Sequence, residues 1–164
     1  MINIKNTQRK IAINIAQINE DVQTFLTTLG YEEFDLGIWI TTDATIQKYN
    51  REYRHKDKPT DILSFPYHDK LKAGKRIKVQ EPEDENLGDL IISAAYVEKD
   101  AERLGITFER RMRRLLVHGI CHLLGYDHMK DSEYKVMLAK ERELLENAFG
   151  KKETAEILVG EISE

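Results

Sequence analysis

Three histidines lie close together in the string HGICHLLGYDH, which runs from His118 to His128. His118 and His122 are four residues apart, so on a helix both imidazoles project from one face and can bind the same ion. Gly125 stands where a helix can end in a left-handed residue, and the chain could then turn so that His128 reaches that ion. Three imidazoles leave one tetrahedral position to water, as in catalytic zinc sites, where the pKa of the water falls to about 7. The string therefore predicts one zinc ion per chain.

A pair of histidines four residues apart is, by itself, more often an accident of a helix surface than a metal site. The third histidine after a suitably placed glycine favours the metal site. Nickel and copper also bind three imidazoles, so zinc follows from geometry and availability rather than from affinity. Cys121 lies beside the ligand face, either as a fourth ligand or, as we favour, as a small buried apolar side chain. His55 and His68 are interpreted as surface residues.

Two arginines extend the histidine face of this predicted helix. Arg111 and Arg114 precede His118 by seven and four residues, which places them on its side. They are candidate substrate-binding residues, with a solvated helix surface as the alternative. The opposite side is apolar and is expected to face the core: Met112, Leu116, Ile120 and Leu123. The formal net charge of −4 argues against a protein that coats nucleic acid by bulk electrostatics, although a local basic cleft is compatible with it.

The elements that must position these residues alternate between strands and helices, which predicts an α/β fold with a small mixed sheet flanked by helices. The helix that carries the histidines is expected over residues 107–124, with Thr107 as its N-cap. Strands are expected at residues 2–4, 34–42 and 87–93, with a brief apolar run at 62–66. Further helices are expected at residues 6–29, 42–53, 93–104 and 131–150, and a surface loop or an irregular hairpin at 68–86.

The length of 164 residues fits a single domain, which we place at residues 1–150 and which is followed by an acidic, loosely ordered tail at 151–164. Hydrophobic residues make up 41% of the chain and charged residues 33%, a balance typical of a globular protein. The only cysteine is Cys121, so no internal disulfide can form. No run has the length of a signal peptide core or a membrane span, and we expect a cytoplasmic protein without membrane contacts.

The pattern H-x-x-x-H-x-x-G-x-x-H is shared with the metzincin metalloproteases, which carry a glutamate directly after the first histidine. In this chain that position is Gly119. Without the glutamate, the proteolytic mechanism lacks its general base, so a peptidase becomes the less favoured interpretation.

In its glycine form, HGICHLLGYDH resembles the signature of the YbeY family of bacterial endoribonucleases, which act as rRNA maturation factors. Two other segments resemble conserved blocks of that family: NREYRHKDKPTDILSFP at residues 50–66 and LGDLIIS at residues 87–93. The resemblance covers roughly residues 31–149. It implies the same α/β fold with a metzincin-like zinc-binding helix, and zinc bound by His118, His122 and His128.

The resemblance also implies that Arg54, which follows Tyr53 shortly before the DKPT stretch, is important for activity. A planar guanidinium suits bidentate contact with a phosphate, so near zinc Arg54 would act as a catalytic phosphate clamp. Lys56 is a further candidate for RNA binding, together with the basic run that contains Arg111 and Arg114. Asp127 is either a group that orients His128 or merely part of a turn. The general base stays open, since water at the metal or the 2′-hydroxyl of the RNA could attack the phosphate.

The function that the resemblance implies is zinc-dependent cleavage of single-stranded RNA in rRNA maturation, including the 3′ end of the small-subunit rRNA, and in ribosome quality control. The implied partners are rRNA, the small ribosomal subunit and assembly factors. Two alternatives remain at this stage: a metallopeptidase-like hydrolase of another substrate, and a non-catalytic ribosome-assembly factor with a structural zinc.

Overall fold

A computed structural model that covers residues 1–164 contains one four-stranded sheet. Its strands are β1 (Ile2–Asn6), β2 (Asp35–Thr41), β3 (Ile62–Pro66) and β4 (Asn86–Ser93). They lie in the order β1-β2-β4-β3, and β1, β2 and β4 are parallel while β3 pairs antiparallel with β4. The predicted mixed sheet is thus confirmed, with β3 as one of its two edges.

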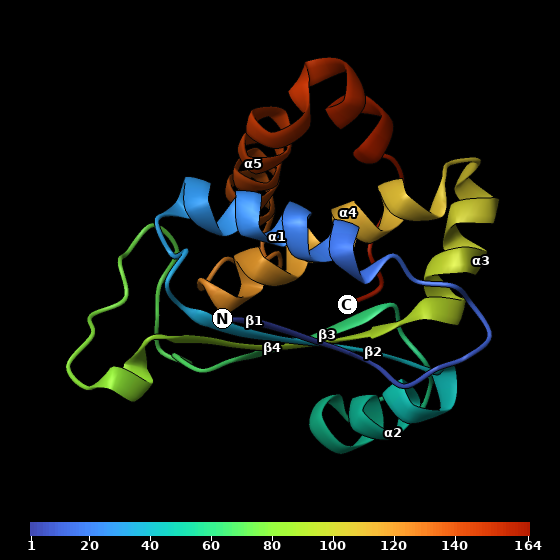
Figure 1. The fold of residues 1–164 in the computed structure, drawn as a ribbon, viewed down its shortest axis with the longest axis horizontal. Coiled ribbons are helices and arrows are strands. Elements are labelled where there is room, and N and C mark those ends of the chain that lie inside the picture. Colours follow the sequence, from blue (N-terminus) through green and yellow to red (C-terminus); the bar gives the residue numbers. More distant parts are fainter.

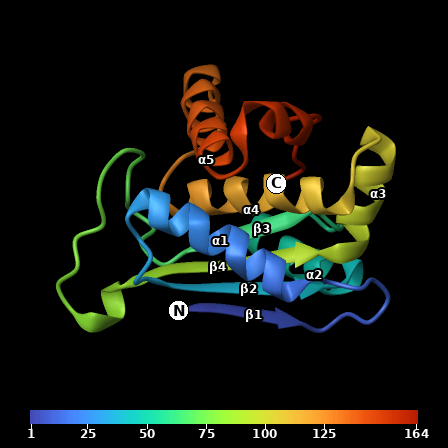
Figure 2. The ribbon, with the colours of Figure 1, turned by 45° about the horizontal axis from the view of Figure 1, so that its top comes forward.

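Five α-helices surround the sheet. They are α1 (Ile15–Leu29), α2 (Asp43–Arg54), α3 (Ala94–Leu104), α4 (Phe108–Leu123) and α5 (Asp131–Ile157), and a short 3-10 helix η1 spans Pro82–Asp84. In Figure 1, α1 and α4 lie on one face of the sheet, α5 lies above them, and α2 lies on the opposite face. The turned view in Figure 2 shows the same layers. No helix is both long and apolar enough to cross a membrane.

The first helix is shorter than its apolar periodicity suggests. A helix was expected from about Asn6, but β1 runs through Asn6 and α1 begins at Ile15. The side chain of Asn14 caps this helix by accepting a hydrogen bond from the backbone N–H of Gln17. Between strand and helix, the side chain of Gln8 accepts from the N–H of Ile11 and donates to its carbonyl oxygen. These local hydrogen bonds give the connection a non-helical course.

The end of the chain also differs from the prediction of a loosely ordered tail. The helix breaks at Gly150, where φ is 84° and ψ is 168°, and then continues to Ile157. Residues 158–164, which we call the strap, return to the layer of α4, where Figure 1 shows the red end of the chain. Ile157 is fully buried. The order of this tail comes from contacts with distant residues, which its own composition does not reveal.

The main core fills the space between the sheet and α1, α4 and α5, and α4 approaches the sheet most closely at Gly119. A Cβ atom there would lie 2.7 Å from Leu90 Cδ2 and 2.8 Å from Ile62 Cδ1. Leu90 and Ile62 are both fully buried, so neither can move aside freely. The helix can therefore lie at this distance only because the residue at 119 has no side chain.

Replacing Gly119 by alanine is expected to destabilise the protein by about 1–3 kcal/mol, because overpacking outweighs the better helix propensity of alanine. Chemical denaturation of the metal-free protein measures this change in the free energy of unfolding. Gly150→Ala is not a suitable control because of its positive φ, whereas Ala139→Gly, on α5, reports the ordinary difference between the two residues. A stability equal to or higher than that of the wild type would show that Leu90 and Ile62 can move to make room for the added methyl group.

Candidate metal centre

Helix α4 positions the first two histidines. The side chain of Thr107 caps the start of the helix by accepting from the N–H of Arg110 at 3.2 Å, as the sequence predicts. His118 and His122 are one turn apart near the other end, and their ring centroids are 4.6 Å apart. The backbone of a well-capped, tightly packed helix thus fixes the separation of the two imidazoles.

The third histidine, His128, follows a turn at Gly125 that requires glycine. Gly125 has a φ of +91°, and a Cβ atom at this position would overlap the carbonyl oxygen of Leu71. The N–H of Gly125 donates to the carbonyl oxygen of His122 at 3.0 Å, which closes the helix end. The His128 ring then lies 5.0 Å from that of His122 and 5.4 Å from that of His118, between centroids. The predicted helix-turn arrangement is confirmed.

The three imidazoles fit a metal ion by their chemistry as well as by their spacing. Their ligand atoms all lie within 4.8 Å of one another. The Nε2 atoms of His118 and His122 are buried and have no hydrogen-bond partner in the protein, a costly state that a metal would relieve. Burial, and then the neighbouring His118 and His128, lower the pKa of His122 to about 4. His122 is therefore neutral at physiological pH and its lone pair is available for a metal.

Glu141, on α5, is a site residue that sequence reasoning missed. Its Oε2 lies 3.6 Å from Nδ1 of His118, and its Oε1 accepts a hydrogen bond from Nε of Arg114 at 3.1 Å. A carboxylate beside Nδ1 favours the tautomer in which Nε2 is free to bind a metal. The sequence did indicate that Glu141 is buried with a partner, because it falls on the apolar stripe of α5, where an unpaired glutamate would be costly.

The basic run before the histidines does not lie free at the cleft, contrary to the expectation for Arg111 and Arg114. Arg111 is fully buried and donates to Asp100 at 3.2 Å. Arg114 lines a hollow beside His118 and His128 but is buried in its pair with Glu141. The two remaining arginines of the run are paired as well, Arg110 with Glu153 and Arg113 with Asp21. Four acidic partners from other elements thus neutralise a run that in sequence resembles an RNA-binding patch.

Arg54, for which the family resemblance implies a role as a phosphate clamp, lies at the end of α2. It lines the same hollow as His122 and His128, although α2 lies on the other face of the sheet from α4. Lys56 is exposed and does not line this hollow. Asp127 lines it, and its carboxylate accepts from the backbone N–H of His128 at 2.7 Å, so it shapes the turn. Cys121 is fully buried in the apolar core.

Glu164, in the strap, is the second site residue that the sequence did not reveal. Its Oε1 lies 3.8 Å from Nε2 of both His118 and His122. Burial raises the pKa of this carboxyl group to about 7, although His118 and hydrogen bonds from Ser64 act in the opposite direction. No local pattern in the sequence connects a residue of the tail with the histidines.

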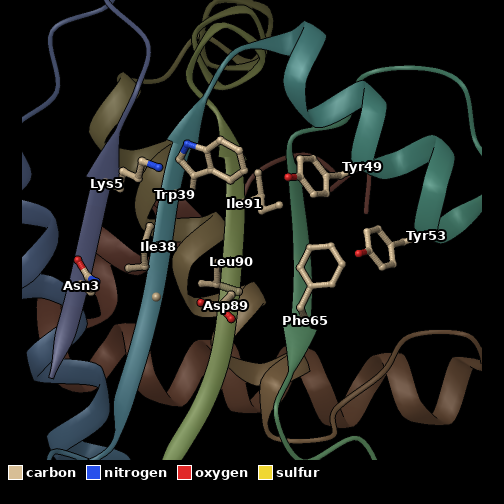
Figure 3. Close-up of a pocket in the computed structure, with 11 residues that line it drawn as sticks. Asn3, Lys5, Ile38, Trp39, Tyr49, Tyr53, Phe65, Asp89, Leu90 and Ile91 are labelled. Atoms are coloured by element: carbon tan, nitrogen blue, oxygen red, sulfur yellow. The ribbon is translucent and has the colours of Figure 1, made fainter.

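A second hollow lies on the other face of the sheet and is lined mainly by aromatic and aliphatic side chains. Figure 3 shows Trp39, Tyr49, Tyr53 and Phe65 around it, with the polar side chains of Lys5 and Asp89 at some distance from one another. It holds no cluster of metal-ligating groups, since the one such cluster consists of the three histidines.

The fold and the site together define an α/β protein with a three-histidine metal centre that opens to a hollow containing an arginine. The sequence profile of the family described as "Endoribonuclease YbeY" matches residues 3–148. A relative from Persephonella marina, named Endoribonuclease YbeY, is 40% identical over 131 residues, which cover 79% of this chain and 80% of the relative. A human protein of the same name is 36% identical, over 87% of this chain and 85% of its own. The chain belongs to the YbeY endoribonuclease family.

One solved structure provides a comparison of the fold. The solution structure of a protein from Thermotoga maritima superimposes with a TM-score of 0.63 and covers 100% of this chain and 99% of its own, at 22% sequence identity. At this identity the likeness concerns the fold alone. It supports the arrangement of sheet and helices described above.

Proposed function

We propose that this protein is a zinc-dependent endoribonuclease that cleaves single-stranded RNA in the cytoplasm during rRNA maturation. The observation that carries the proposal is that Arg54 lines the same hollow as His122 and His128, so a phosphate-binding group faces a metal centre. Membership of an endoribonuclease family supports RNA as the substrate. The 3′ end of the small-subunit rRNA, ribosome quality control, and the small subunit and assembly factors as partners rest on the family resemblance.

Each side chain of the site has a separate role in the proposed reaction. His118, His122 and His128 would hold the ion, and Glu141 would keep Nε2 of His118 directed toward it. A zinc ion bound there supplies a Lewis acid and lowers the pKa of water. The guanidinium of Arg54 can donate two parallel hydrogen bonds to the scissile phosphate and offset the negative charge that develops on it.

The rival peptidase function finds no support in the packing of α4. A metzincin-type glutamate would have to occupy position 119, but Gly119 faces the side chains of Leu90 and Ile62 in the core. A glutamate at this position would therefore clash with the core and would point toward the sheet.

Cleavage assays on a single-stranded rRNA fragment and on the same fragment annealed to its complement test the proposal directly. We expect the zinc-loaded protein to cut the single strand only, and a chelator to stop the reaction. A 2′,3′-cyclic phosphate on the product identifies attack by the 2′-hydroxyl, whereas its absence identifies water as the nucleophile. Cleavage that persists after the metal has been removed would contradict the proposed function.

Replacing Arg54 by alanine is expected to lower kcat by roughly 10²-fold, because a charged donor to the transition state is lost. Arg54→Lys should recover only part of this, since an ammonium group cannot form two parallel hydrogen bonds to a phosphate. Single-turnover cleavage of a short RNA measures both variants. Arg51→Ala is the matched control, because Arg51 lies on the same helix and its side chain is 55% exposed in a pair with Asp57. Equal losses in both variants would count against a specific clamp.

A further inference from the structure

The carboxylate of Glu164 lies beside two of the three histidines of the candidate metal centre. Its Oε1 is equidistant, at 3.8 Å, from the Nε2 atoms of His118 and His122. Both of these nitrogens are buried and have no hydrogen-bond partner. The Glu164 side chain is only 11% exposed. Carboxylate oxygen is, with imidazole nitrogen and thiolate, one of the three protein ligands that zinc binds.

Hydrogen bonds from β3 fix this carboxylate in place. The backbone N–H of Ser64 donates to Oε2 at 2.6 Å, and the Ser64 hydroxyl donates to Oε1 at 2.9 Å. Each carboxylate oxygen therefore has a donor of its own, and Oε1 still faces the histidines. This is the geometry by which neighbouring hydrogen bonds commonly orient a metal-binding carboxylate.

The rest of the strap is held by buried groups that lie far away in the sequence. The N–H of Ser163 donates to Asp61, which is fully buried, at 2.9 Å. Arg111, also fully buried, donates to the backbone carbonyl oxygens of Val159 and Glu161. The position of Glu164 is thus built into the fold, even though the strap lies outside residues 3–148, which the family profile matches.

Charge gives the reason for a metal at this point. A buried carboxylate is costly without a positive partner, and the only basic side chains that pair with Glu164 are those of His118 and His122. Ser64 supplies two hydrogen bonds but no charge. A dication held by the three histidines would provide the missing positive charge.

We propose that Glu164 is a fourth protein ligand of the metal in the resting protein, and that a phosphate of the RNA has to displace it. This inference rests on the proposed function for its second half, because RNA is the displacing group. Only the Glu164 side chain has to move in such a displacement, because separate hydrogen bonds with Asp61 and Arg111 hold the preceding residues of the strap. Glu164 would then stabilise the bound metal and at the same time compete with substrate.

Zinc affinity provides the first test. The full-length protein is loaded with zinc and titrated with a chromophoric chelator, for the wild type, Glu164→Gln and Glu156→Gln. Glutamine keeps an acceptor for Ser64 but is a poor zinc ligand, so we expect the zinc Kd to rise at least tenfold. Glu156→Gln removes the same charge from an exposed position and should leave the Kd unchanged. An unchanged Kd for Glu164→Gln would overturn the inference.

Two additional measurements separate ligation from folding and from RNA cleavage. Thermal unfolding of the metal-free variants shows whether Glu164→Gln folds. Ser64→Ala, which keeps the carboxylate but loses one donor, should raise the zinc Kd by a smaller factor.

Binding of a 2′-O-methylated single-stranded RNA, at saturating zinc, should tighten severalfold in Glu164→Gln. Unchanged RNA binding would overturn the displacement step. If zinc affinity falls while neither protein cleaves RNA, the proposed function fails and the fourth ligand stands.

Discussion

Replacing His122 by alanine is expected to weaken zinc binding strongly and to suppress RNA cleavage while the domain stays folded. His122 contributes one of the two buried Nε2 atoms of the ligand cluster, and without it only His118, His128 and the proposed ligand Glu164 remain to hold the ion. Because the metal supplies several kcal/mol of transition-state stabilisation, its loss should lower the cleavage rate by at least ~10³-fold. Elemental analysis and single-turnover kinetics measure the two effects.

The folded state should survive because the core does not depend on the metal. The apolar residues between the sheet and α1, α4 and α5 form one continuous buried cluster in which none of the three histidines takes part. Circular dichroism of the variant, and of the chelated wild type, checks this. His55→Asn is the matched control, since His55 is exposed and asparagine tolerates the positive φ of 58° at this position. If chelation unfolds the wild type, the zinc is structural. That result would favour the non-catalytic ribosome-assembly factor over the endoribonuclease.

Replacing Arg111 by alanine is expected to destabilise the protein by about 3–5 kcal/mol, the largest effect on stability among these substitutions. The Arg111 guanidinium lies 3.2 Å from Asp100 and 3.8 Å from Asp61, and both Arg111 and Asp61 are fully buried. Removing it leaves a carboxylate in the interior without its counter-charge and two carbonyl oxygens of the strap without a donor. Denaturation with urea measures the change in the free energy of unfolding.

Arg103 provides an unusually close control for this experiment. It pairs with the same acceptor, Asp100, at the same 3.2 Å, but its own side chain is 61% exposed. Arg103→Ala should therefore cost less than about 1 kcal/mol, as expected of a solvated ion pair. RNA binding per folded molecule should be similar in the Arg103 and Arg111 variants if Arg111 is structural. A selective loss of RNA affinity at an unchanged stability would restore the substrate-binding role that its position in the sequence suggested.

The features that the sequence predicted correctly are those that neighbouring residues determine. Thr107 caps the helix that follows it, and α3 ends at Leu104, as expected. The histidine centre belongs to the same group, because its ligands lie on one helix and the turn after it. Periodicity failed at the start of α1, where Ile11 fits the apolar stripe but Asn14 caps the helix after it.

The features that escaped prediction depend on pairings between distant residues. Arg111 and Arg114 lie on the histidine side of α4, but their partners Asp100 and Glu141 come from α3 and α5. A basic run has the same sequence whether its charges face solvent or buried carboxylates, so only the tertiary structure distinguishes the two. The same holds for Glu164, whose contacts with Ser64 join residues 100 positions apart.

The hydrogen bonds between Ser64 and Glu164 also affect the sheet itself. β3 is an edge strand that pairs only with β4, and an edge with free N–H groups is open to strand addition by another chain. The Ser64 N–H is directed away from β4 and is taken by the Glu164 carboxylate, which has no N–H of its own to continue a ladder. The strap therefore protects this edge strand. Because Glu164 accepts the hydrogen bond of the Ser64 N–H, it blocks intermolecular β-pairing at the position next to the metal centre.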